Sequence, residues 1–302
     1  MEDNYSLNVP PNNKEITLSK FSHKGWDFYS HTENMMNSKD LDILIKDKEE
    51  NCLFVSHLPE IFYGYNRLFL INESANFCYE FNPLQMLSLT SNAIRQKLLK
   101  EKEIYYIPSQ AKSQYSKSDD NAADEDWSFS SPYIGHITSI NNCCISKYYN
   151  KINETKKFQI EKSDIKFPET KVENVLNYNQ VHFFEDELGD IGFSEGKIGF
   201  GVMNECFLGL MRCYLRVDNM LVRNIDTKIY HKFGDKYIIR NFTVKEKTYD
   251  ELKNNGFHLS NQWNISTNQS ETVAPFLGKP IFEITDLIYV YFLSIFYNLI
   301  RK

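Results

Sequence analysis

The second half of the chain carries its most regular hydrophobic pattern, a series of segments rich in β-branched and aromatic residues. These segments are 175–184, 197–203, 206–217, 220–232 and 236–244, and turn-forming residues separate them. Asp218-Asn219 and Gly234-Asp235 provide two of the turns. Connections this short join antiparallel strands only, because a parallel crossover needs roughly a dozen residues or more. The pattern therefore predicts an antiparallel meander.

The first half of the chain alternates less regularly. Apolar and polar residues alternate near 25–29, 68–71 and 77–81, which predicts three more strands. Apolar residues recur at helical spacing from residue 84 to about 102, with basic residues late in the run, and this predicts a helix. Residues 109–126 and 147–171 are polar and charged, so we expect solvated loops there, the second with short strands or an exposed helix.

These elements define an expected domain organisation. Residues 1–17 are polar and contain Pro10-Pro11, which predicts a flexible lead-in. Residues 18–250 are expected to form one compact α+β domain, in which antiparallel sheets make a meander or sandwich-like arrangement with flanking helices. Residues 251–302 form a divergent C-terminal extension. Its apolar end, 287–300, is shorter than the roughly 20 residues that span a bilayer. It is therefore expected to dock as a terminal helix or strand, with a membrane-tethered adaptor as the alternative.

Composition narrows the class of partner. Hydrophobic residues make up 42% of the chain and aromatic residues 15%, which is enough apolar surface for a sizeable core. The net charge of -6 and the lack of a long basic run argue against nucleic acid as the main partner. The first residues are acidic and include no apolar stretch, so we expect no secretory signal and a cytoplasmic or nuclear protein.

Residues that carry chemistry are scattered. The six cysteines form no C-x-x-C pair and are interpreted as reduced, mostly packed thiols, and the seven histidines show no metal-ligand spacing. Nucleotide-binding and nucleophile-elbow motifs are missing from the sequence. The acidic cluster of Glu185, Asp186, Glu187 and Asp190 leaves two interpretations open: a solvated turn, or the centre of a metal-assisted hydrolase. We expect no cofactor and no catalysis.

Arg212 is the exception in the otherwise apolar run 206–215. Such a run is typical of a strand buried on both faces. An unpaired buried guanidinium is very costly, so Arg212 is expected either to meet a carboxylate or to line a cleft.

Three stretches together resemble a known family. They read DWSFSSPYIG at 126–135, FEDELGDIG at 184–192 and LRVDNMLVRNIDTKIYH at 215–231. In that order they are similar to the motifs of the TIPRL family, the TIP-forty-one-like regulators of the TOR signalling pathway. Residues 58–60, 64–66 and 78–82 extend the resemblance upstream, so that it covers roughly 25–244.

The resemblance implies a non-catalytic protein that binds the catalytic subunits of type 2A serine/threonine phosphatases. The expected site is a cleft that accepts the C-terminal tail of the phosphatase. The family is also tied to TOR signalling together with a second phosphatase-binding regulator, alpha-four/Tap. Its fold is a compact domain of antiparallel sheets with flanking helices, and we expect a monomer of that kind here.

A cleft for a peptide that ends in a free carboxylate needs basic side chains with apolar slots beside them. Arg212, Arg216, Arg223 and Lys228 are the basic candidates, and aspartates nearby would hold the guanidiniums in place. The alternative is that these charges pair within the sheet and serve only the fold. The partner-binding set predicted in this way is Arg212, Arg216, Asp218, Arg223, Asp226, Thr227, Lys228, Tyr230, Met203 and Trp127.

The chain also departs from the family pattern. Gly199 and Gly201 stand where the family has two outward basic residues. Gln85 replaces an acidic residue in the helix after Asn82, and Asn241 replaces a glutamate.

Overall fold

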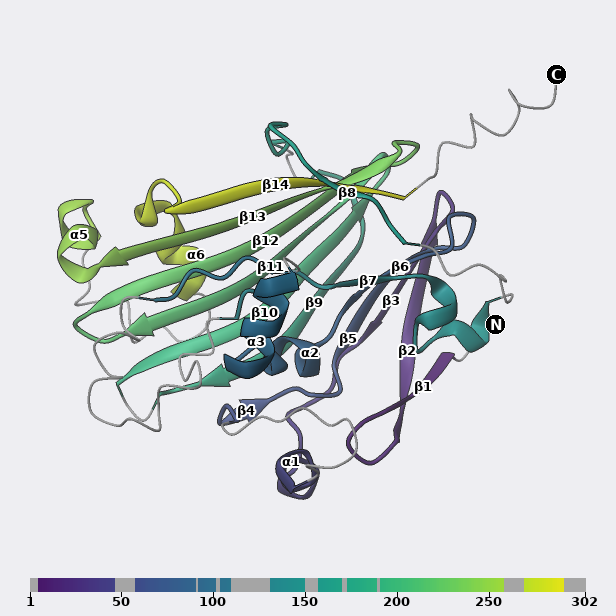
Figure 1. Ribbon diagram of the computed structural model, residues 1–302, viewed down its shortest axis with the longest axis horizontal. Coiled ribbons are helices and arrows are strands. Elements are labelled where there is room, and N and C mark those ends of the chain that lie inside the picture. Colours follow the sequence, from purple (N-terminus) through teal and green to yellow (C-terminus); the bar gives the residue numbers. More distant parts are fainter. Residues whose placement is uncertain are drawn as a thin grey trace.

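The computed structural model describes residues 5–46, 58–90, 92–101, 104–109, 131–149, 157–169, 173–188, 191–257 and 269–290 (Figure 1). Two antiparallel sheets account for most of these residues. The smaller sheet lies at one side of the view in Figure 1, and the long strands of the larger sheet fan out across the other. The predicted α+β class with antiparallel sheets is confirmed.

The smaller sheet has six strands in the order β1-β2-β3-β5-β6-β7. Their bounds are β1 Tyr5–Val9, β2 Lys14–His23, β3 Trp26–His31, β5 Arg67–Asn72, β6 Phe77–Phe81 and β7 His136–Thr138. The prediction of a flexible lead-in is wrong from residue 5 onward, because β1 and β2 pair as a hairpin. The alternating Leu7, Val9, Ile16 and Leu18 are all buried. Burial of this apolar face orders the hairpin, although most of its other residues are polar.

The larger sheet has eight strands in the order β4-β9-β10-β11-β12-β13-β14-β8. Their bounds are β4 Ile61–Phe62, β8 Ile160–Lys162, β9 Val175–Asp186, β10 Gly192–Met203, β11 Cys206–Val217, β12 Leu221–Lys232, β13 Tyr237–Thr248 and β14 Phe282–Tyr289. The predicted meander is confirmed in β9 to β13, each paired with the next. Asn219 and Gly234 adopt the positive φ angles of 60° and 96° that tight turns require.

The two sheets pack face to face around an aromatic core. Trp26 and Phe28 of β3 meet Phe207 of β11 at ring-centroid distances of 5.1 and 5.5 Å, and Phe28 meets Phe200 of β10 at 5.3 Å. All four rings are at most 2% exposed. Because these rings come from strands far apart in the sequence, burying them fixes how one sheet sits on the other.

Short helices flank the sheets: α1 Ser38–Lys46, α2 Pro83–Ser88, α3 Asn92–Glu101, α5 Tyr249–Asn254 and α6 Gln269–Val273, with 3₁₀ turns η2 Ile140–Asn142, η3 Ser146–Tyr148 and η5 Ala274–Leu277. The helix predicted over 84–102 is thus two helices. Asn82 caps α2 by accepting a hydrogen bond from the Leu84 N–H, and Leu89 closes that helix after six residues. Helices α5 and α6 cover one end of the larger sheet, where Tyr214 and Val222 form a second small core with them.

The C-terminal extension contributes to the sheet. β14 pairs with β13 from Phe282 to Tyr289, so the start of the apolar run 287–300 is a docked strand, and residues 291–300 lie outside the described residues. No helix within the part of the chain that the structure describes is long and apolar enough to cross a bilayer.

Candidate functional site

Each strand of the larger sheet alternates its side chains between two faces. The inner face packs on the smaller sheet and carries Ile198, Phe200 and Val202 of β10. The outer face is the opposite one and carries Lys197, Gly199 and Gly201 of the same strand. Across the sheet, register places directly paired residues on the same face, so the position of every candidate residue follows from its partners.

Arg212 and Asp226 form a closed ion pair on the outer face. They are directly opposite each other in the register of β11 and β12. The Arg212 Nε donates to Asp226 Oδ1 at 2.7 Å and Nη2 donates to Oδ2 at 2.8 Å, while Nη1 reaches the Ser270 carbonyl of α6 at 3.2 Å. Burial alone would lower the pKa of Arg212, but Asp226 outweighs it and the pKa is raised. Arg212 is therefore paired with a carboxylate of its own chain. The sequence predicted either this pairing or a position in the lining of a cleft.

Arg216 and Asp218 also satisfy each other. The Arg216 Nε lies 2.8 Å from Asp218 Oδ1, and its Nη1 donates to the Gln269 side chain of α6 at 2.8 Å. The Tyr249 hydroxyl of α5 donates to Asp218 at 3.1 Å. Both residues therefore tie the end of the sheet to the helices that cover it.

Arg223 and Thr227 lie on the inner face, opposite to Arg212. Arg223 is fully buried and pairs with Glu246, its register partner on β13, at 3.1 Å, and it also donates to the Ile107 carbonyl. Thr227 Oγ1 donates to the Tyr133 carbonyl at 3.1 Å. The predicted residues are consequently not one surface, because the sheet separates Arg223 and Thr227 from Arg212, Asp226, Lys228 and Tyr230.

A groove of about 1350 Å³ crosses the outer face and contains the remaining basic candidate, Lys228. The segment 163–169, which follows β8, forms one wall, and β11 to β14 form the floor. The half-buried Leu208 and Leu210 give the floor an apolar centre. Lys228 Nζ lies 5.9 Å from the ring centroid of Phe167 in the wall, and Phe167 in turn makes an edge contact with Tyr230 at 6.3 Å.

The charges around the groove favour an anionic occupant. Lys162, Lys166, Lys228 and Lys245 line it, against three carboxylates, Asp164, Glu169 and Glu283. Among the described residues no carboxylate lies within 4.0 Å of the Lys228 ammonium group, which lies beside the Phe167 ring. An apolar floor with a half-buried lysine beside an aromatic ring has the chemistry that binds an extended peptide with a terminal or side-chain carboxylate.

Two departures from the family pattern shape this face. Gly199 and Gly201 occupy positions on the outer face of β10, as predicted. The exposed ring of Tyr178 lies over them, and a Cβ on Gly199 would come within 3.0 Å of the Tyr178 hydroxyl. In the groove, the Asn241 amide donates to Glu283 at 2.9 Å and to Thr285 at 3.1 Å. A glutamate in place of Asn241 would face Glu283 with a like charge.

Three other predicted positions lie away from the groove or outside the described residues. Met203 is buried at the end of β10, and Trp127 lies outside the described residues. Gln85 on α2 accepts a hydrogen bond from the hydroxyl of the buried Tyr133 at 2.9 Å.

The acidic cluster forms local contacts. Asp186 is buried and accepts hydrogen bonds from the backbone N–H groups of Glu60 at 3.0 Å and Leu188 at 2.6 Å. Glu185 accepts one from the Tyr63 hydroxyl at 3.3 Å. Asp190 lies outside the described residues. Within the described residues, these carboxylates hold β4 against β9 and do not converge with a third metal ligand, so the geometry does not favour the hydrolase alternative.

Sequence reasoning missed the wall of the groove. Residues 163–169 belong to the charged stretch 147–171, for which the sequence predicts a solvated loop with short strands or an exposed helix, because its apolar residues are scattered. The signal available was the lone aromatic Phe167 between Lys166 and Pro168, a pattern that fits a segment laid on a surface but does not say which one.

Comparison with known proteins shows which family this chain resembles. The profile of the TIP41-like family matches residues 61–253. The chain is similar to a TIP41-like protein of Dictyostelium discoideum, with 34% identity over 214 residues, 69% of this chain and 73% of that protein. It is 27% identical over 237 residues to the TIP41-like protein of Rattus norvegicus, covering 77% and 78% of the two chains. It is 29% identical over 249 residues, 75% and 62%, to the type 2A phosphatase activator TIP41 of Saccharomyces cerevisiae. The chain therefore belongs to the TIP41-like family.

Proposed function

We propose that this protein is a non-catalytic regulator that binds the catalytic subunit of type 2A serine/threonine protein phosphatases. The observation that carries the proposal is membership of the TIP41-like family, two of whose members are named type 2A phosphatase activators. The absence of nucleotide-binding and nucleophile motifs from the sequence agrees with a role in binding.

The outer-face groove is the docking site in this proposal. Its floor provides apolar contacts through Leu208 and Leu210, and Lys228 is placed to bind a carboxylate. The terminal tail of the phosphatase subunit is the segment that we assign to it, because a free C-terminal carboxylate pairs with an ammonium group beside an apolar slot. Phe167, which lines the groove and packs against Tyr230, provides that slot.

The arginines take a supporting role. Arg212, Arg216 and Arg223 each meet a carboxylate of the same chain at 2.7 to 3.1 Å, so they hold the sheet and its covering helices in place. Releasing Arg212 or Arg223 to a ligand would strand a buried carboxylate, at a cost of several kcal/mol, whereas the Asp218 side chain that pairs with Arg216 is 40% exposed. The tail is thus recognised mainly by Lys228 and the aromatic residues.

The wider setting follows from the family. We expect the protein to act as a monomer in the cytoplasm, with a further presence in the nucleus, to modulate phosphatase complexes in TOR-type signalling, and to share the phosphatase with the alpha-four/Tap regulator. Each of these expectations depends on the phosphatase interaction itself.

Binding of purified catalytic subunit by the immobilised full chain tests the proposal. We expect capture of the intact subunit, and weaker capture of a subunit that lacks its last few residues. Equal capture of the two forms would show that the tail does not contribute to binding. No capture of either form would refute the proposed function.

A further inference from the structure

A second group of reactive side chains lies on the smaller sheet, away from the groove. Cys78 and Glu80 of β6 alternate with Phe77, Tyr79 and Phe81, so they point to the face of the smaller sheet that is turned away from the larger one. Residues 139–149 cover this face. The Ile140 N–H donates to Asn76 Oδ1 at 3.0 Å at one end of the covering segment.

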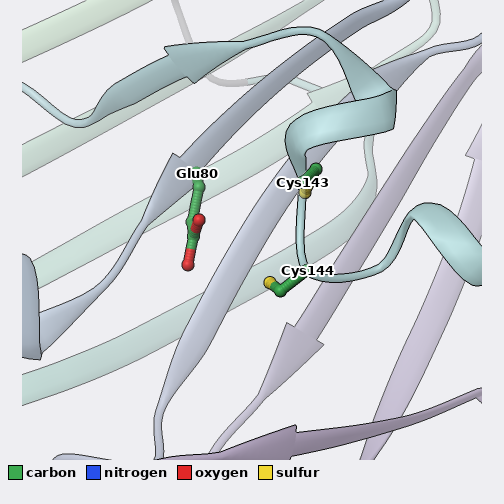
Figure 2. Close-up of side chains that lie close together, drawn as sticks. All are labelled: Glu80, Cys143 and Cys144. Carbon is green, nitrogen blue, oxygen red and sulfur yellow. The ribbon is translucent and has the colours of Figure 1, made fainter. Parts of the chain in front are cut away.

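The covering segment brings Cys143 and Cys144 to Glu80. One ligand atom of each of the three residues lies within 4.8 Å of the other two. Figure 2 shows Glu80 on its strand, with the two cysteines on the chain after the 3₁₀ turn η2 and the Cys144 sulfur turned toward the carboxylate. Cys78 lies beside Cys143, with its Sγ 2.8 Å from the Sγ of Cys143.

These donors suit a thiophilic divalent cation. Two thiolates and a carboxylate are ligands that Zn²⁺ takes, and in a tetrahedral site donor atoms about 2.3 Å from the ion are about 3.8 Å from one another. The present spread of up to 4.8 Å needs only small side-chain rotations to close. Cys143 is buried while Cys144 is exposed, so an ion can enter from the solvent side.

The charge balance of the surroundings also suits such an ion. Glu80 is 6% exposed and lies near the buried Arg67, whose Nε is 3.9 Å from Glu80 Oε1. Without an ion, the neutral thiols and the Glu80–Arg67 pair carry no net charge. Exchanging one Zn²⁺ for the two thiol protons leaves the net charge at zero, so metal binding adds no uncompensated charge to a buried site.

We propose that Glu80, Cys143 and Cys144 bind a divalent thiophilic cation of the Zn²⁺ class, with a water molecule in the fourth position. Cys78 acts as a positioning residue that donates its S–H to the Cys143 sulfur. The bound ion links β6 to the covering segment and holds that segment on the smaller sheet. This inference does not depend on phosphatase binding.

Metal retention by the reduced full-length chain tests the site. The chain is stripped with a chelator, loaded with Zn²⁺ in the presence of a phosphine reductant, dialysed, and analysed for bound metal. We expect one ion per chain and a higher melting temperature in the loaded protein. Loading with Co²⁺ should produce the charge-transfer absorption of thiolate-bound cobalt, which reports the sulfur ligands without any substitution.

Matched variants separate ligands from bystanders. Cys143→Ser, Cys144→Ser and Glu80→Gln should each weaken Zn²⁺ binding at least about 100-fold, and Cys78→Ser about 10-fold with the stoichiometry unchanged. Cys206→Ser, which alters a half-buried cysteine on the larger sheet, is the control and should bind as the parent does. Circular dichroism checks that each variant is folded. A parent chain that retains no Zn²⁺ and shows no cobalt–thiolate absorption, or that loses binding equally in Cys206→Ser, overturns the proposal.

Discussion

Replacing Asp226 by asparagine removes the charge that neutralises Arg212 while preserving the size of the side chain. Arg212 is 8% exposed and Asp226 4%, and two hydrogen bonds of 2.7 and 2.8 Å join them. Removing one partner of such a pair leaves a buried, uncompensated charge, which costs about 3 to 5 kcal/mol. Because the Ser270 carbonyl still accepts one hydrogen bond from Arg212, we expect a loss near the lower end, about 3 kcal/mol.

Urea unfolding followed by tryptophan fluorescence measures this loss. A double variant, Arg212→Met with Asp226→Leu, removes both charges and should recover most of the stability, because an apolar pair of similar volume replaces the ion pair. Asp250→Asn is the control: its side chain is 92% exposed, and its 3.8 Å contact with Lys253 should contribute nothing measurable. An Asp226→Asn variant that loses less than about 1 kcal/mol, or a double variant no better than the single one, would refute the assignment of Arg212 to the fold.

Three further predictions concern other parts of the chain. Gly135→Ala should destabilise the protein by about 2 to 4 kcal/mol in urea unfolding, because φ at Gly135 is 77° and a Cβ there would clash with the Tyr79 ring. Gly256→Ala is the control: φ is 86° but the space around it is open, so the loss should be about 1 kcal/mol. Thr248→Ala should lower stability by about 1 kcal/mol by removing the capping box of α5. Burial lowers the pKa of His231, so wild-type stability should fall as the pH drops below about 6.5, and His231→Phe should lose that part of the pH dependence.

The meander could be predicted from the sequence because its information is local. Segment 206–217 was predicted with the bounds that β11 has, and the turns at Asn219 and Gly234 fall where their residue types indicate. β10 begins five residues before the predicted segment, at Gly192. The missing part contains the buried Ser194 and Glu195, which give no apolar signal, and Glu195 accepts a hydrogen bond from Ser270 of α6.

The partners of the buried charges could not be predicted, because register decides them. The sequence required Arg212 to find a carboxylate but left several candidates. Asp226 is chosen because β11 and β12 pair with a turn at 218–220, which sets these two residues opposite each other. The same rule places Arg223 opposite Glu246 and Arg240 opposite Asp286, on the other face of the sheet. Without the register, charges on opposite faces look like neighbours.

The groove depends on contacts that are remote in sequence. Its floor comes from strands within 206–285 and its wall from 163–169, and no periodicity links the two. The site of Glu80, Cys143 and Cys144 has the same origin, since more than sixty positions separate the strand from the covering segment. Sequence spacing predicts metal sites only where the ligands share one local element.

The most direct test of the phosphatase account is the affinity of the Lys228→Glu variant for the intact catalytic subunit, measured by titration calorimetry beside Lys253→Glu. Lys228 lies in the groove without a carboxylate partner among the described residues, whereas Lys253 lies on α5 and is 58% exposed. The account predicts at least a tenfold loss for Lys228→Glu, about 1.4 kcal/mol, and little change for Lys253→Glu. Unchanged affinity in a folded Lys228→Glu variant would contradict the assignment of the groove as the phosphatase-binding site.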